Sequence, residues 1–278
     1  MAKARVQSAR EVHSVLAAGM ADPELLENWC SDPSTAATLS AHAAEIDFEQ
    51  VRRFSGLVTK VRYSDLRSNF PATFRLRDGA GLSIELFASY APRAAALRKA
   101  GLNSKSDKLA ALLEFLNGWL VLEDPVHALV WDVIRHEGAI FQIQTNAGRS
   151  GRPTVIAEVT RDSTPVRSAG AVMHRMTCNP VEAVRVVRTH GSLESIPREP
   201  AVYAYCATVR EGQIRIIEID ELCAFLMEAA DGTGTIAELA ERLRESGVDL
   251  ETEELIDAAR GLMRAGLLEP AEGCEACG

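Results

Sequence analysis

The chain has 278 residues, of which 47% are hydrophobic and 25% are charged, and its 39 acidic side chains outnumber its 30 basic ones to give a formal charge of −9. This composition is typical of a globular protein and excludes the disordered and fibrous classes. The acidic balance argues against a general binder of nucleic acid or of membrane surfaces, whose affinity comes from a basic face. At this length we expect about two domains.

The first residues give information about the compartment. Charged side chains such as Arg10 and Glu11 interrupt the apolar ones, which is unlike the apolar segment of a secretory signal peptide. No run of roughly 18 apolar residues occurs, so no membrane-spanning helix is expected. We therefore expect a cytoplasmic protein whose six cysteines are mostly buried thiols and form no structural disulfide.

Residues 1–138 are expected to form a helical domain. Asp22 and Asp32 each precede a proline. This pair is typical of a helix start, because the aspartate can accept hydrogen bonds as the N-cap and the proline, as first helical residue, needs no N–H. The aromatic and aliphatic residues of this region recur at helical spacing. They are Trp29, Phe48, Phe54, Leu57, Val58 and Val61.

Two further helices follow from apolar stripes over 109–120 and 128–134. We expect the second to end at Gly138, since glycine is favoured just beyond a helix end. His136 and Glu137 would then lie at the end of this helix, where a protonated histidine suits the helix dipole. An acid–base pair is the alternative, but neighbouring helical residues point about 100° apart.

Residues 139–200 are expected to form a β-rich linker region that packs on the C-terminal part. Residues 140–145 alternate in polarity, and 154–160 are rich in β-branched side chains, with a turn rich in Gly, Arg and Ser between them. This pattern predicts a β-hairpin or meander. A further strand is expected over 171–176, followed by a short helix over 180–188.

The next region predicts a small winged-helix-like unit. Two β-rich runs, 202–209 and 213–219, flank a tight turn. Three amphipathic helices follow, of which the second begins with a capping box of Thr235 and Glu238 and the third ends at Gly266. The expected fold is therefore α+β. Its parts are the helical domain 1–138, the β-rich region 139–200, the winged-helix-like domain 201–270 and a tail, 271–278.

The tail carries Cys274 and Cys277, a spacing at which two thiolates bind one metal ion or form a redox pair. A tetrahedral zinc site needs two more ligands, and no second pair of this spacing occurs. Three interpretations remain open: a frayed terminus, metal or redox chemistry completed by a partner, and recognition of the tail by another protein.

The run 213–219 has apolar residues on both faces, because Ile216 and Ile217 break strict alternation. If nothing covers its edge, an extended peptide can add to it as a further strand. The alternative is that the rest of the chain covers both faces. The residues of this candidate site are Gln213, Ile214, Arg215, Ile216, Ile217, Glu218 and Ile219.

The region after Tyr203 combines a hairpin, a helix after Asp220, a glycine turn at 231–235 and a closing apolar segment at 261–268. In this order the elements resemble the precursor-peptide recognition domain of pathways that make ribosomally synthesised and post-translationally modified peptides (RiPPs). The resemblance implies that a leader peptide docks as a strand beside Gln213–Ile219 and against the third helix. On that helix the matching positions are Ile256, Ala259 and Met263.

The front of the chain has a second, sparse resemblance. The pattern of Leu26 and Trp29 before Asp32, the segment 61–73 that begins Val-Arg-Tyr-Ser-Asp, and later aromatic pairs are similar to the helical half of certain partner proteins. Those proteins assist multinuclear non-haem iron oxidative enzymes, as in the methanobactin and thiaglutamate pathways. The aromatic residues concerned are Phe48, Phe54, Phe87, Tyr90, Phe115 and Trp119.

Together the resemblances imply a non-catalytic partner subunit with no cofactor of its own. It would bind a Cys-containing precursor peptide and present the cysteine to an enzyme that holds the iron, as a heterodimer that needs neither nucleic acid nor membrane. Tethering a substrate in this way raises its effective concentration at the metal.

Two other classes stay open. A winged-helix DNA-binding regulator would need basic residues on its third helix, which instead begins with Glu251, Glu253 and Glu254. An enzyme acting alone would need polar groups that converge from distant positions, such as His136, Glu137 and His174. No two histidines have the helical spacing of a local metal site.

Overall fold

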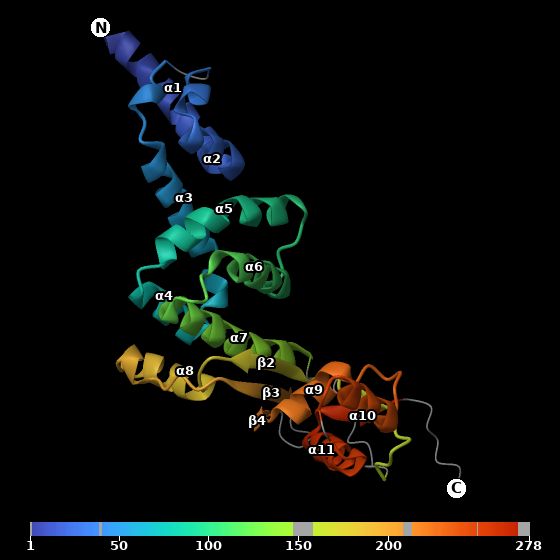
Figure 1. Cartoon of the computed structure of the whole chain (residues 1–278). Coiled ribbons are helices and arrows are strands. Elements are labelled where there is room, and N and C mark those ends of the chain that lie inside the picture. Colours follow the sequence, from blue (N-terminus) through green and yellow to red (C-terminus); the bar gives the residue numbers. More distant parts are fainter. Residues whose placement is uncertain (1, 39–40, 147–157, 208–212, 249, 272–278) are drawn as a thin grey trace. The chain divides into compact units, whose positions relative to one another are not determined.

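The computed structural model describes residues 2–38, 41–146, 158–207, 213–248 and 250–271 (Figure 1). The chain divides into two compact units, Met1–Trp131 and Asp132–Gly278. The described residues form eleven α-helices and two small antiparallel sheets, so the α+β class is confirmed.

The described residues of the first unit form helices. Its α-helices are α1 (Ala2–Ala21), α2 (Pro23–Ser31), α3 (Phe48–Arg62), α4 (Pro71–Gly79), α5 (Ser83–Lys99) and α6 (Lys105–Trp119). Asp22 caps α2, since its carboxylate accepts hydrogen bonds from the backbone N–H groups of Glu24 and Leu25 at 3.2 and 3.3 Å. Asp32 precedes a short 3₁₀ helix, Pro33–Thr38, and not an α-helix.

Close packing joins α2 to α3 and α3 to α5 in this unit. Leu26 and Trp29 of α2 are each 2% exposed and pack with Phe48, whose ring centroid lies 5.5 Å from that of Trp29. Where α3 crosses α5, Gly56 allows a close approach: a Cβ at this position would lie 2.6 Å from the backbone nitrogen of Ala88.

Helix α7 (Pro125–Asn146) corrects two expectations. It continues through Gly138, and residues 140–145 belong to it and form no strand. The reason is the spacing of the residues that face the sheet of the second unit: His136, Ala139 and Ile143 recur at the helical intervals of three and four residues. The expected partner of 140–145 lies partly outside the described residues, and 158–160 form no strand.

The second unit contains a three-stranded antiparallel sheet made of β2 (Val172–Met176), β3 (Ala201–Ala207) and β4 (Ile214–Ile219), in the order β2-β3-β4. The strand expected at 171–176 and both expected β-rich runs are thus confirmed, while their turn at 210–212 lies outside the described residues. A second sheet pairs β1 (Pro165–Arg167) with β5 (Leu268–Pro270).

The helices of the second unit agree with the sequence. They are α8 (Pro180–Arg188), α9 (Glu221–Ala229), α10 (Ile236–Glu245) and α11 (Thr252–Ala265). Thr235 and Glu238 form the expected capping box, and Gly266 ends α11 with a left-handed φ of 80°.

Alternate residues of the three-stranded sheet pack into two different clusters. On one face, Tyr203 and Tyr205 pack with Ala139 and Ile143 of α7. On the other, Ala204 and Cys206 join the buried core of α9, α10 and α11. The sheet is therefore covered by helices on both faces.

Among the described cysteines, Cys178 and Cys206 are buried and Cys30 and Cys223 are half-buried, all four as free thiols. The pair Cys274 and Cys277 lies outside the described residues. In the described part of the chain, no helix combines the length and the apolar character needed to cross a bilayer.

Candidate functional site

Strand β4 lies at an edge of its sheet. It pairs antiparallel with β3 from Val202↔Ile219 to Ala207↔Ile214, and in the described residues no strand pairs with its other side (Figure 1). An edge strand presents unpaired backbone N–H and C=O groups to which an extended peptide can bond. The structure therefore places Ile214–Ile219 where strand addition is geometrically possible; Gln213 is exposed and directly precedes the strand.

The side chains of β4 are divided between the two faces of the sheet. Ile214 and Ile216 pack against the cluster that includes α7, and Ile217 and Ile219 pack against the core of α9, α10 and α11. All four are half-buried. The chain itself thus covers part of both faces, as the alternative interpretation of this strand required. Among the described strands, none pairs with the outer backbone edge of β4.

Two charged side chains of β4 are exposed, Arg215 and Glu218. Glu218 lies opposite Tyr203, whose hydroxyl donates a hydrogen bond of 3.1 Å to the carboxylate. Burial and this carboxylate raise the pKa of Tyr203 to about 12. The tyrosine therefore stays protonated and holds Glu218 in place beside the open edge.

The three candidate residues of α11 differ in their surroundings. Ala259 is 0% exposed and Ile256 is 6% exposed, and both belong to the hydrophobic core. Met263 packs on the same core and is half-buried. Of the three, only Met263 therefore has appreciable surface for a docked peptide, while Ile256 and Ala259 hold α11 in position.

A second group of polar residues lies buried between α7 and the sheet. The Asp132 side chain is 0% exposed and accepts hydrogen bonds from the backbone N–H and the hydroxyl of Thr177 at 2.7 and 2.6 Å, and from Arg135 at 2.9 Å. The Nδ1 atom of His136 lies 3.1 Å from the hydroxyl of Tyr205. These contacts connect one face of α7 to β3 and to the residue that follows β2.

His136 and His174 both contact the ring of Tyr205, with ring centroids 5.6 and 6.1 Å away. The expectation that His136 lies at a helix end is wrong, since it sits within α7 and is 4% exposed. Burial lowers the pKa of each histidine to about 4, and burial raises the pKa of Tyr205. At neutral pH the three side chains are therefore uncharged.

The structure thus brings together two of the three residues considered for an enzyme acting alone. Glu137 is buried as well but, as the next residue along the helix, projects about 100° away from His136. Enclosure of His136 leaves a substrate no route to its imidazole, so the geometry favours a structural role. Sequence reasoning missed Tyr205 and Asp132; the four-residue spacing of Asp132 and His136 on one helix face was the available signal.

The described residues contain no candidate metal site, and the comparisons identify no family. In the described ranges, no group of three or more His, Cys, Asp and Glu side chains is arranged to hold a metal ion. Comparison with protein-family models gives no match, and comparison with curated proteins gives none. The function is therefore inferred from geometry and from the sequence resemblances.

Proposed function

We propose that this chain is a non-catalytic, cytoplasmic partner subunit in RiPP biosynthesis, which binds the leader of a Cys-containing precursor peptide and presents it to a multinuclear iron-dependent oxidative enzyme. The observation that carries the proposal is the open edge of β4 in a unit that continues as three helices. In this proposal β3, β4 and α9–α11 form a winged-helix-like recognition domain.

The leader would bind by strand addition. Its backbone would pair with the outer N–H and C=O groups of Ile214–Ile219, which gives affinity without demanding a particular sequence. Selectivity would come from the exposed side chains of the edge strand, Arg215 and Glu218, and from the half-buried Met263 of α11. Their mixed charge favours a leader with both acidic and basic residues beside its apolar positions.

The chemistry would belong to the partner enzyme, which supplies the iron. This chain would contribute position: a leader held on β4 keeps the core cysteine at a high local concentration near the metal. The Cys274 and Cys277 tail has no part in this proposal.

The complex can be tested by a tagged pull-down of the full chain, co-expressed with the proteins encoded beside it. Iron content and bound peptides are measured in the same eluate. We expect an iron-loaded enzyme and a short Cys-containing peptide to co-elute. Recovery of the chain with neither of them would contradict the proposal. The next tests would then be salt-dependent retention on DNA, for a regulator, and turnover without a partner, for an enzyme.

The β4 edge is tested by charge reversal at Arg215. We expect Arg215→Glu to weaken binding of a synthetic leader peptide about tenfold, measured by fluorescence anisotropy, because it reverses the charge along the docking edge. Arg167→Glu is the matched control, since Arg167 is an exposed arginine on strand β1 of the other sheet. Equal effects of the two substitutions on leader binding would contradict the assignment of the leader site to β4.

A further inference from the structure

Helix α3 carries an exposed apolar stripe. Phe54, Leu57 and Val61 are 51%, 43% and 63% exposed, and their spacing of three and four residues places them on one helix face about 10 Å long. The opposite face carries Gly56, which meets Ala88 of α5. A large aromatic and two aliphatic side chains aligned in this way form an exposed apolar patch, and contiguous patches of this kind often mark interaction sites.

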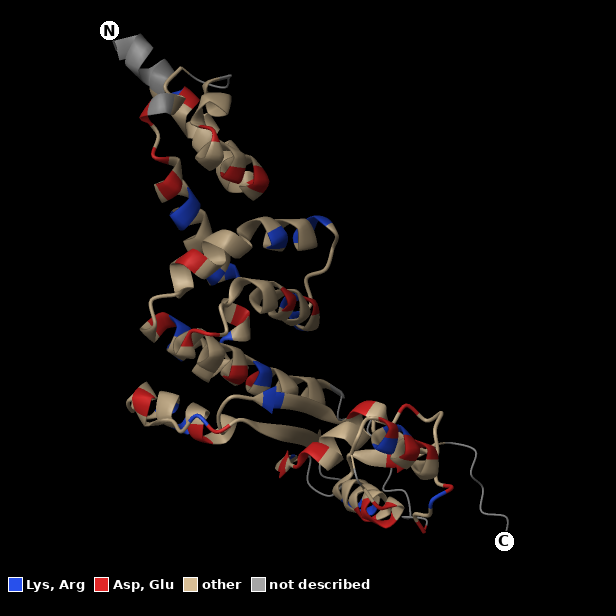
Figure 2. Cartoon of the chain, in the orientation of Figure 1, with Lys and Arg blue, Asp and Glu red and all other residues tan. Residues whose placement is uncertain are grey.

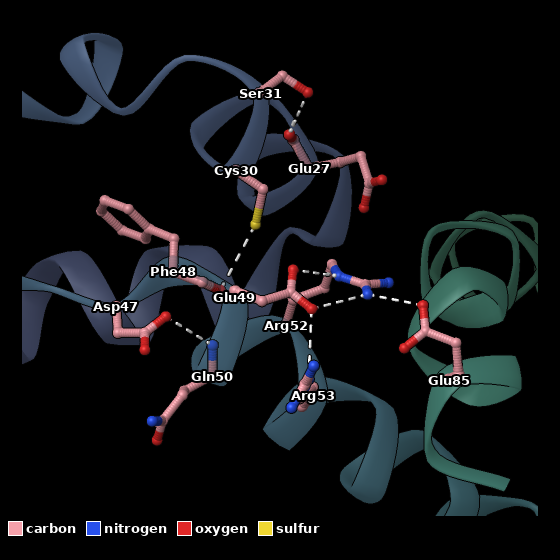
Figure 3. A network of polar contacts seen from close by, with 10 residues as sticks. All are labelled: Glu27, Cys30, Ser31, Asp47, Phe48, Glu49, Gln50, Arg52, Arg53 and Glu85. Atoms are coloured by element: carbon pink, nitrogen blue, oxygen red, sulfur yellow. Dashed lines mark hydrogen bonds and ion pairs between the residues drawn. The ribbon is translucent and has the colours of Figure 1, made fainter. Parts of the chain in front are cut away.

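Helix α3 is rich in basic residues, since it contains Arg52, Arg53, Lys60 and Arg62 but only one acidic residue, Glu49 (Figure 2). Several of them already have acidic partners. Arg52 lies 2.9 Å from Glu49 and 2.7 Å from Glu85 of α5 (Figure 3), and Lys60 lies 2.8 Å from Asp78. These ion pairs fasten α3 to its neighbours and leave the stripe uncovered.

The C-terminal end of the stripe differs, because Arg62 and Arg98 of α5 are like charges that lie close enough to repel each other. Burial and the nearby Arg62 guanidinium lower the pKa of Arg98. In the ranges that the structure describes, no carboxylate forms an ion pair with either arginine, although both are exposed. An acidic group placed between them would relieve this repulsion.

We propose that the stripe of Phe54, Leu57 and Val61, together with Arg62 and Arg98, docks an amphipathic helix of another protein that carries Asp or Glu beside its apolar face. Apolar side chains would pack into the stripe, and the acidic ones would pair with the two arginines. A second copy of α3 fits less well, because it would bring two sets of basic side chains together. This inference goes beyond the proposed function, since it stands on residues of the first unit and needs no peptide on β4.

The occupant can be identified by placing a photo-cross-linker in the full chain, co-expressed with the proteins encoded beside it. Val61→p-benzoylphenylalanine reports on the stripe, and the same substitution at Val181, a 48% exposed valine of α8, is the control. We expect position 61 alone to give a product, whose attached segment has apolar residues at helical spacing with Asp or Glu beside them. A second copy of this chain, a lipid, a segment without acidic residues, or equal or absent yields at the two positions would each overturn the proposal.

The charge component has its own test. We expect the double substitution Arg62→Glu and Arg98→Glu to lower the cross-linking yield at position 61 at least about fivefold. In the chain that keeps both arginines, raised salt should also lower this yield. Circular dichroism checks that the double variant folds. An unchanged yield in a folded variant would refute the role of the two arginines, and leader binding measured on the same sample tests the β4 proposal separately.

Discussion

Tyr205 lies between two histidines that burial keeps neutral. The pKa of His136 and of His174 is lowered from 6.5 to about 4 in the folded chain. Unfolding therefore takes up protons between these values, and the folded state loses stability as the pH falls from about 6.5 towards 4. For His136 the full loss amounts to roughly 3 kcal/mol, at 1.36 kcal/mol for each pKa unit.

This pH dependence can be measured by urea unfolding between pH 7.5 and pH 4.5. We expect His136→Gln to flatten the decline of unfolding free energy with falling pH, because the variant removes one group that titrates on unfolding. His13→Gln, at an exposed position of α1, serves as the control. A decline as steep in His136→Gln as in the parent chain would show that His136 is not the group responsible.

Arg77 is a buried cation that aromatic rings help to stabilise. It is 2% exposed, and its guanidinium carbon lies 4.3 and 4.5 Å from the ring centroids of Phe74 and Phe87. Its Nε atom donates to the Ser83 hydroxyl at 2.9 Å. Its Nη2 atom forms no hydrogen bond but lies 3.7 Å from the Asp78 carboxylate, as an ion pair. Burial lowers the pKa of Arg77 to about 10, so the side chain remains charged at neutral pH.

Packing, more than charge, should decide the contribution of Arg77 to stability. We expect Arg77→Ala to lower the free energy of unfolding by about 3 kcal/mol, because it leaves a cavity between two rings. Arg77→Met retains most of the volume and should cost less than about 1.5 kcal/mol. Equal losses in the two variants, measured by urea unfolding, would contradict this and assign the stability to the cation.

At the scale of elements, the crossing of α3 and α5 depends on Gly56. We expect Gly56→Ala to destabilise the chain by about 2 kcal/mol, since the added Cβ would meet the backbone of Ala88 at 2.6–2.9 Å. Gly118→Ala in α6 meets nothing within 4 Å and should raise stability by up to about 1 kcal/mol through helix propensity. Thermal unfolding of both variants provides the comparison; a stabilised Gly56→Ala would mean that the helices can move apart without cost.

Elements with local signals were predictable from the sequence, and those set by distant contacts were not. Thr235 and Glu238 each accept a hydrogen bond from the other's backbone N–H within one turn. The four residues 235–238 therefore suffice to predict the start of α10. Residues 140–145 alternate in polarity like a strand but belong to helix α7. Ala139 and Ile143 of this helix pack against a sheet whose first strand along the chain begins only at Val172. Tertiary contact outweighed the local pattern there.

The candidate site shows the same limit. The strand character of Ile214–Ile219 follows from its composition, but its edge position depends on β2, which takes the other side of β3. The enclosure of His136 likewise depends on Tyr205, 69 residues later in the chain. Neither fact is contained in the spacing of nearby residues.

At the scale of the whole molecule, the two proposed surfaces belong to different units. The helix-docking stripe lies in Met1–Trp131, and the β4 edge lies in Asp132–Gly278. Substitutions at independent sites usually act additively. The two activities should therefore be separable within one chain.

This separation can be tested with two variants of the full chain. Val61→Glu should abolish capture of the protein whose helix docks on the stripe and leave leader affinity within about twofold. Arg215→Glu should weaken leader binding and leave that capture unchanged. Pull-down and fluorescence anisotropy on the same preparations provide the two readouts. Loss of both activities in either variant would indicate coupled sites.

An open β4 edge also has a consequence for the chain before any guest arrives. Four isoleucines in a six-residue segment form the kind of sequence that assembles with copies of itself, and natural proteins oppose this with charges on the exposed strand. Arg215 and Glu218 are the exposed charged residues of β4 and are suited to that role. The side chains proposed to select a leader would thus also oppose aggregation of the peptide-free chain. Replacing both by neutral residues should therefore make the peptide-free chain aggregate faster.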